Sequence, residues 1–182
     1  MAAALLTVLC VAAGVVLGLL YGGRVDRVLH FRPELWPVGA GGLAVELILR
    51  IGGWSGGWAV AFDVLATIAL IVFAAANVRL GGMVLILAGL GLNLIPTVVN
   101  WGTPTSRDAL VTAGVIDKGT GTVELSGPRH VATDDDTFRF LGEVIALPTE
   151  QVISFGDLVM SIGYLLVASS LVRGRVLRRD PD

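Results

Sequence analysis

Six polar residues lie within or at the ends of apolar stretches of this 182-residue sequence, where side chains with acid, base or amide chemistry are unusual. A charged or amide group in apolar surroundings is costly unless it finds a partner. Acids at such positions could transfer protons, and a base beside them could pair with an acid or hold an anionic group. The candidate polar cluster comprises Glu46, Arg50, Asp63, Asn93, Asn100 and Asp157.

The spacing of these residues predicts specific partners. Glu46 and Arg50 are four residues apart with the acid first, which is the favourable order for an ion pair on one helix face. Asn93 and Asn100 are seven residues apart, so a helix would present both on one side. Pro96, between them, leaves the carbonyl of Leu92 without its usual helical donor. We therefore expect the asparagines to be interhelical partners for the charged groups.

The elements that position these residues are predicted to be transmembrane helices. Hydrophobic residues make up 54% of the chain and charged residues only 15%, and the mean hydropathy is +0.80. Ordinary soluble domains are about 45 to 50% apolar and about 25% charged. We expect an all-α membrane protein that forms a single membrane domain over residues 1–182. A net charge of -2 gives no support for nucleic-acid binding.

Five apolar stretches predict a bundle of about five transmembrane helices. The predicted spans are residues 2–20, 38–53, 54–78, 81–100 and 153–171. The second would be only about 24 Å long, which is short for a hydrocarbon core of about 30 Å. The first carries Gly14 and Gly18, a pair of small residues through which helices can pack closely, and we consider self-association through them.

The distribution of basic residues predicts that the N-terminus is outside and the C-terminus is cytoplasmic. With that orientation, the inside segments hold eight of the thirteen basic residues: Arg24, Arg27, Arg32, Arg79, Arg173, Arg175, Arg178 and Arg179. The extracytoplasmic segment 101–152, roughly 50 residues long, holds four basic and eight acidic residues, a net charge of -4. Tryptophans at the span ends fit the interfacial positions that this residue prefers: Trp36, Trp54, Trp58 and Trp101.

The same topology places the whole candidate polar cluster in the outer half of the membrane. At about 1.5 Å per residue, Glu46, Asp63 and Asn93 would lie roughly 10 to 15 Å below the outer surface. Arg50, Asn100 and Asp157 would lie nearer the outer edge. The cluster could be packing between helices, or it could line a pocket for a small polar solute or a lipid headgroup. Asp157 could also simply complement the dipole of the last helix.

Short elements are expected in the segment outside the membrane. Thr105 to Val115 begins with a Thr-x-x-Asp pattern that predicts a capped surface helix. Residues 122–125 alternate as a strand does and could form a hairpin with residues 129–132. The apolar stretch Phe138 to Pro148 is predicted to dock on the bundle or on the membrane surface, because its large side chains would otherwise lie in water.

No motif indicates a metal, a cofactor or a known catalytic centre. The acidic run at Asp134 to Asp136 lacks the spacing of a calcium loop, and His130 has no second histidine or cysteine nearby. The sequence contains no P-loop, H-E-x-x-H or C-x-x-C pattern. We expect no cofactor and no bound metal. A single cysteine, Cys10, excludes an intramolecular disulfide.

Several short motifs occur in a distinctive order along the second half of the chain. They are Asn100-x-Gly102-x-Pro104, His130-Val131, Asp136-Thr137, FLGEVIALP over residues 140–148, and Ser154-x-Gly156-Asp157. In this order they resemble a bacterial family of small multi-pass membrane proteins of unknown function. The resemblance begins near Gly22, and the chain departs from it at Thr103, where that family tends to have methionine. It implies a multi-pass protein of a bacterial plasma membrane and no particular activity.

Three classes of function are compatible with these features. The leading interpretation is a non-enzymatic accessory or scaffold bundle, whose partners would be the lipid bilayer and another membrane protein. The second is a carrier or binding protein for a small polar solute or lipid headgroup, using Glu46, Arg50, Asp63 and Asn93. The third is an intramembrane enzyme that modifies a lipid, with Asp63 or Asp157 as acid or base.

Overall fold

A computed structural model describes residues 2–121 and 123–174 of the chain. The protein is mostly helical, with 61% helix and seven helices. The helices are α1 (Ala2–Leu20), α2 (Asp26–His30), α3 (Trp36–Gly52), α4 (Gly57–Ala76), α5 (Met83–Val99), α6 (Arg107–Thr112) and α7 (Phe155–Arg173). A 3-10 turn, η1 (Arg139–Leu141), and four short strands complete it: β1 (Thr103–Thr105), β2 (Arg129–Val131), β3 (Ile145–Leu147) and β4 (Gln151–Ile153).

Each of the five predicted spans contains one long helix. Among the described residues, two of these helices, α4 and α7, are long and apolar enough to cross a membrane, and Leu5–Leu20 and Met83–Val99 are shorter apolar helices. The helix of the third span, predicted over about residues 54–78, is α4, which begins at Gly57. Gly53 and Gly56 adopt left-handed φ angles of 61° and 83° that end one helix and precede the next.

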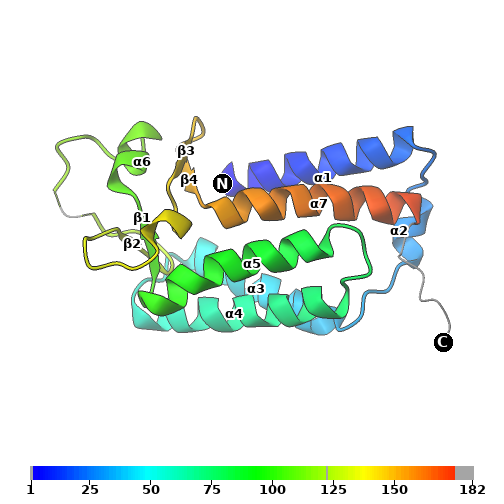
Figure 1. Cartoon of the computed structure of the whole chain (residues 1–182), viewed down its shortest axis with the longest axis horizontal. Helices are drawn as coiled ribbons and strands as arrows, with labels where there is room; N and C mark the ends of the chain where they lie inside the picture. The colour runs from blue at the N-terminus through cyan, green and yellow to red at the C-terminus, as the bar shows by residue number, and fades with distance from the viewer. Residues whose placement is uncertain (1, 122, 175–182) are drawn as a thin grey trace.

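The five long helices lie side by side in the order α1, α7, α5, α4, α3 (Figure 1). Helix α7, the last in the chain, therefore packs between the first helix and α5. The central apolar core lies at the contact of α4, α5 and α7. Its buried residues are Ala74, Leu80, Met83, Ile86 and Leu90.

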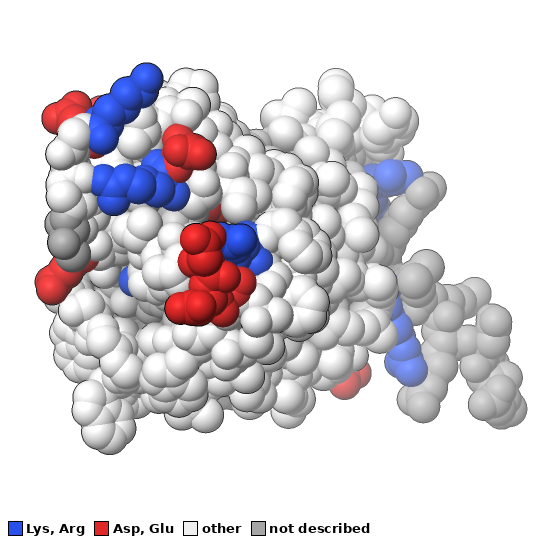
Figure 2. Space-filling model, turned by 60° about the vertical axis from the view of Figure 1, so that its left-hand side comes forward, with Lys and Arg blue, Asp and Glu red and all other residues white. Residues whose placement is uncertain are grey.

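The two ends of the bundle differ in composition. The segment between α5 and α7 forms one end, which we call the strand-bearing end (Figure 1). At the opposite end, which we call the arginine-rich end, Arg27 donates a hydrogen bond to the Arg173 carbonyl at 2.7 Å. There the Asn77 side chain also exchanges two hydrogen bonds with the Glu34 backbone, at 2.9 and 2.8 Å. Figure 2 shows charged side chains gathered towards the two ends, with mostly uncharged surface between them.

Gly14 and Gly18 pack against α7 of the same chain. A methyl group on Gly14 would overlap the Leu165 carbonyl oxygen, and one on Gly18 would lie 2.9 Å from the Cβ of Val172. Because α7 already covers this glycine face, the interpretation that it serves self-association is corrected to an intramolecular contact.

The strand-bearing end contains a small core of its own. Helix α6 contributes Ala109, Leu110 and Ala113 to it, and β4 contributes Val152. Helix α6 lies at the surface as predicted, with Arg107, Asp108 and Thr112 exposed, but the prediction that Thr105 caps it is wrong. Ser106 is the N-cap, accepting a hydrogen bond from the Ala109 backbone N–H, whereas Thr105 is fully buried in β1. An apolar face that includes small alanines lets this short helix pack inwards.

The strand pairing also differs from the prediction. Strand β2 pairs in parallel with β1, with Pro104 opposite His130, and residues 123–125 form no strand. Thr122 lies outside the described residues. A hairpin does occur, but it joins β3 to β4, with Ile145 opposite Ile153. Leu125 instead packs on the core formed with α6, so a tertiary contact outweighs its local strand pattern.

The stretch 138–148 docks as predicted, except for two aromatic rings. Turn η1 lies against α5, and β3 is held in the hairpin. Leu141, Ile145 and Leu147 are half-buried. Phe138 and Phe140, however, remain 44% and 62% exposed.

We expect Gly14→Ala to destabilise the protein by about 1 to 3 kcal/mol, because the added methyl group forces α1 away from α7. Thermal unfolding of the purified protein in detergent would measure this. Gly91→Ala in α5 is the matched control, because nothing lies within 4 Å of its added Cβ. The control should be neutral or slightly stabilising. Equal stability of the two variants would contradict the close α1–α7 contact.

Candidate functional site

The six residues of the candidate polar cluster lie towards the strand-bearing end, but they form three groups. Glu46 and Arg50 come from α3 and Asp63 from α4. Asn93 and Asp157 join α5 to α7. Asn100, the residue that follows α5, contacts the segment beyond it. The sequence therefore identified polar positions near one end of the bundle. In the structure these positions form three separate groups rather than one cluster.

The first group joins α3 to α4. The Nε atom of Arg50 lies 3.8 Å from Oε2 of Glu46, and the two side chains are 66% and 21% exposed. Asp63 of α4 also lies near the carboxyl group of Glu46. This group therefore combines an ion pair with a second, neighbouring acid.

The side chains of the second group, Asn93 and Asp157, form hydrogen bonds with each other and with Ser154. Asn93 donates from Nδ2 to Oδ1 of Asp157 at 2.9 Å, and its Oδ1 accepts a hydrogen bond from the Ser154 hydroxyl at 2.7 Å. Asp157 accepts from the Ser154 backbone N–H at 2.8 Å, while the Ser154 hydroxyl accepts from the Asp157 N–H at 3.0 Å. This reciprocal pair is a capping box for α7. Asp157 thus acts as a first-turn acid in the way the sequence suggested.

Close helix packing makes the second group possible. A methyl group on Gly156 would overlap Oδ1 of Asn93, so only glycine leaves room for that amide. Asn93 was expected to be a partner for Glu46, Arg50 or Asp63, and this expectation is corrected, because both ends of its amide are used by α7. The Ser-x-Gly-Asp motif was visible in the sequence, but its partner on α5 was not.

The third group is a clamp between Asn100 and Thr137. Oδ1 of Asn100 accepts from the Thr137 N–H at 2.8 Å, and its Nδ2 donates to the Thr137 carbonyl, also at 2.8 Å. The same Nδ2 donates to the Pro96 carbonyl at 2.8 Å. Asn100 was expected to serve charged groups on other helices. It instead fixes the segment beyond α5, because it follows the last turn of that helix.

Glu143 is a polar residue that the candidate list missed. Its Oε2 accepts from the Thr105 hydroxyl at 3.1 Å and lies 3.5 Å from Nη1 of Arg129. Its side chain is 16% exposed. Burial raises the pKa of Glu143, although the Arg129 guanidinium opposes that shift. The signal in the sequence was an acid within the otherwise apolar stretch 140–148.

His130 and Asp136 form a second polar contact at the strand-bearing end. Their Nε2 and Oδ1 atoms are 3.0 Å apart. Burial alone would raise the pKa of Asp136, but hydrogen bonds from the Thr133 N–H and from His130 outweigh it, so the pKa lies below its usual range. Within residues 2–121 and 123–174, no group of three or more histidine, cysteine, aspartate or glutamate side chains could hold a metal ion.

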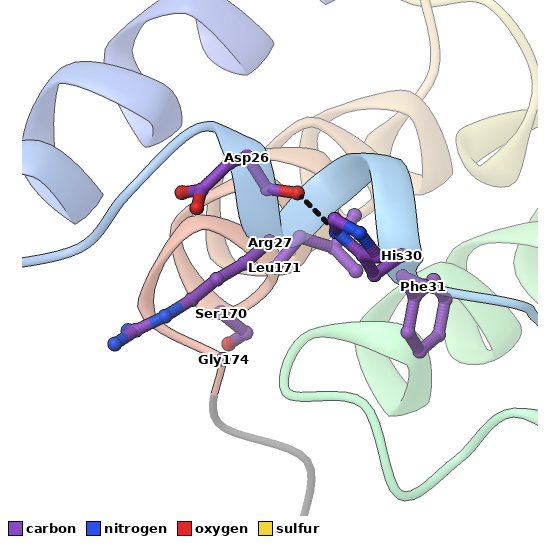
Figure 3. Close-up of a pocket in the computed structure, with 7 residues that line it drawn as sticks. All are labelled: Asp26, Arg27, His30, Phe31, Ser170, Leu171 and Gly174. Atoms are coloured by element: carbon purple, nitrogen blue, oxygen red, sulfur yellow. Dashed lines mark hydrogen bonds between the residues drawn. The ribbon is translucent and has the colours of Figure 1, made fainter.

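A pocket of about 330 Å³ lies at the arginine-rich end, away from all three groups (Figure 3). It lies between α2 and the end of α7. Its lining residues are Asp26, Arg27, His30, Phe31, Ser170, Leu171 and Gly174. His30 is hydrogen-bonded through Nδ1 to the Asp26 carbonyl at 2.9 Å, and Arg27 is engaged with α7. Of these basic groups, Arg27 therefore helps hold α2 on α7, whereas His30 bonds within α2.

The comparisons with known proteins place the chain in an uncharacterised group. A family model described as a family of unknown function, DUF5317, matches residues 43–168. This range includes the motifs between Asn100 and Asp157 that suggested an uncharacterised family. No curated protein and no solved structure matches the chain.

We expect Glu46→Gln and Arg50→Met to be coupled in a double-mutant cycle. Removing one charge leaves the other without its partner, so each single change should lower stability, and the double change should recover part of the loss. A coupling free energy of about 0.5 to 3 kcal/mol is expected from detergent unfolding measurements. As a control, Glu46→Gln combined with Arg79→Met at the opposite end should be additive. Zero coupling for Glu46 and Arg50 would show that the two side chains do not meet.

We expect Glu143→Gln to change how stability depends on pH. When the pKa of a carboxyl group is higher in the folded state than in the unfolded state, the group stabilises the fold at pH values below its unfolded-state pKa. This stabilisation is lost as the pH rises through the folded-state pKa. Glutamine stays neutral, so the variant's melting temperature should improve relative to the parent between pH 4 and pH 7. Glu150→Gln, at an exposed position, should show no such trend. A parallel pH dependence for parent and Glu143→Gln would contradict the effect of burial.

Proposed function

The chain belongs to the DUF5317 family of unknown function, and we propose that it is a multi-pass membrane protein that acts without catalysis, as an accessory or scaffold bundle. The observation that carries this proposal is the second polar group. Asn93, Ser154 and Asp157 satisfy one another across the α5–α7 contact. Polar groups used in this way stabilise helix packing and leave no free chemistry for a substrate.

Apolar surface on the helices supports the membrane part of the proposal. Every long helix has a large aliphatic side chain that is more than half exposed. Examples, one from each helix, are Val8 (61%), Leu43 (60%), Leu65 (62%), Val84 (59%) and Ile162 (56%). Soluble monomers rarely expose such surface continuously, whereas lipid tails cover it without cost.

The arginines support an orientation with the N-terminus outside and the C-terminus cytoplasmic. Arg24, Arg27, Arg79 and Arg173 all belong to segments at one end of the bundle. Positive charge accumulates on the cytoplasmic side of membrane proteins. The strand-bearing end, with its excess of acids, would then be extracytoplasmic. The resemblance to bacterial proteins supports a bacterial plasma membrane as the proposed location.

A second candidate function is the binding of a small polar solute or a lipid headgroup at the first polar group. Arg50 keeps 66% of its side chain exposed despite its pairing with Glu46. A guanidinium in this state retains donors for an anionic or polar ligand. The enzyme alternative is weaker for Asp157, because its two carboxylate oxygens accept hydrogen bonds from Asn93 and Ser154.

The topology can be tested with reporter fusions in a bacterial host. We expect a C-terminal fusion after Asp182 to give cytoplasmic fluorescence. An alkaline phosphatase insertion within residues 119–121 should be active outside, and a fusion after Ser55 in the short α3–α4 connection should match it. An alkaline phosphatase signal from the C-terminal position would reject the orientation, and signals on one side from all three positions would reject the multi-pass bundle.

A further inference from the structure

Three exposed aromatic residues lie at or near the two backbone positions that the Asn100–Thr137 clamp joins at the end of α5. Trp101 is 62% exposed, Phe138 is 44% exposed and Phe140 is 62% exposed. The two phenylalanine rings form an edge-to-face pair with centroids 6.3 Å apart and an interplanar angle of 72°. Turn η1, which carries Phe140, packs against α5. We call these three residues the aromatic edge.

The Asn100 clamp brings the parts of the aromatic edge together. Asn100 binds the backbone of Thr137 through two hydrogen bonds, and Trp101 and Phe138 are the residues that directly follow the two clamped positions. The clamp therefore fixes the end of α5 next to η1. Three large aromatic rings stay exposed beside this polar contact, although burying them would be favourable in water.

Backbone strain points the same way. Trp101 has a φ of 50° and Phe138 a φ of 56°. This left-handed region is unfavourable for bulky residues, so it persists only where the surroundings enforce it. Both positions belong to the aromatic edge, and Leu35 and Glu150 elsewhere in the described residues adopt the same region. The surroundings therefore fix the backbone at Trp101 and Phe138.

We infer that the aromatic edge inserts into the interfacial layer of the lipid bilayer beside the strand-bearing end of α5. This inference rests on the proposed membrane location. The edge continues the exposed apolar surface of α5, where Ile95, Val98 and Val99 are 43%, 48% and 52% exposed. Tryptophan and other aromatic rings favour the boundary between hydrocarbon and water. The segment between α5 and α7 is thereby anchored in the outer leaflet at its aromatic edge.

The charged neighbour of the two rings fits this interfacial depth. Arg139 lies between Phe138 and Phe140 in the sequence, and its Nη1 donates to Asp134 at 2.8 Å and to the Thr133 carbonyl at 3.0 Å. The guanidinium is therefore paired with Asp134 and with the Thr133 carbonyl. The aromatic edge can enter the interface without bringing an unpaired charge with it.

Tryptophan quenching by brominated phospholipids tests this anchor in the full-length protein reconstituted into vesicles. The background carries Trp36, Trp54, Trp58 and Trp101 each changed to Phe. One reporter, Phe140→Trp, samples the aromatic edge. Leu65→Trp samples the lipid-exposed middle of α4 as a positive control, and Lys118→Trp samples an exposed turn as a negative control.

We expect bromines near the headgroup to quench the Phe140→Trp reporter at least twofold more than the Lys118→Trp reporter. Deep bromines should quench the Leu65→Trp reporter most strongly. If Leu65→Trp is quenched but Phe140→Trp behaves like Lys118→Trp, the proposed interfacial anchor is wrong. The proposed membrane location is then still supported. If neither is quenched, the proposed membrane location fails as well. A shielded Phe140→Trp reporter that no bromine quenches would mean that protein covers the edge, which also overturns the anchor.

Removing the Asn100 clamp is a second, independent test within the same experiment. Asn100→Ala should reduce interfacial quenching of the Phe140→Trp reporter at least twofold, because η1 loses its attachment to α5. Asn77→Ala removes a similar backbone clamp at the arginine-rich end and should leave that quenching unchanged. Unchanged quenching of the Leu65→Trp reporter verifies that each variant keeps the bundle. Equal effects of the two asparagine variants would overturn the role of the clamp.

Discussion

Polar groups at the strand-bearing end can exist among apolar helices only if other parts of the chain satisfy them. The contact of Asn93 with Ser154 and Asp157 is the central example. It joins the start of α7 to the middle of α5, and it caps α7 with the same atoms. The position of α7 between α1 and α5 depends on this network, because the helix can begin only where its first turn is satisfied.

Small residues make this arrangement sterically possible. Gly156 admits the Asn93 amide, and Gly14 admits the backbone of α7 from the other side. Helix α7 is therefore approached closely by two neighbours. Between helices in lipid, van der Waals packing takes the place of the hydrophobic effect. A glycine has no side chain, so it stabilises the bundle by letting two helix backbones approach closely.

In the segment between α5 and α7, polar groups are also satisfied by other parts of the chain. Asn100 binds the Thr137 backbone, and Glu143 accepts a hydrogen bond from the buried Thr105 hydroxyl. Parallel pairing of β1 with β2 and the hairpin of β3 with β4 add further hydrogen bonds at this end.

The sequence by itself determined the helices and the residues whose polarity conflicts with their surroundings. Apolar periods and glycine breaks act over a few residues, so five long helices and the Glu46–Arg50 spacing followed from local pattern. Only the tertiary structure decided which polar groups meet. Asn93 binds α7 rather than α3 or α4, because helix order and glycine contacts set its neighbours. Likewise, residues 129–131 pair with β1 rather than with residues 123–125, because strand pairing joins distant segments whose alignment no local pattern encodes.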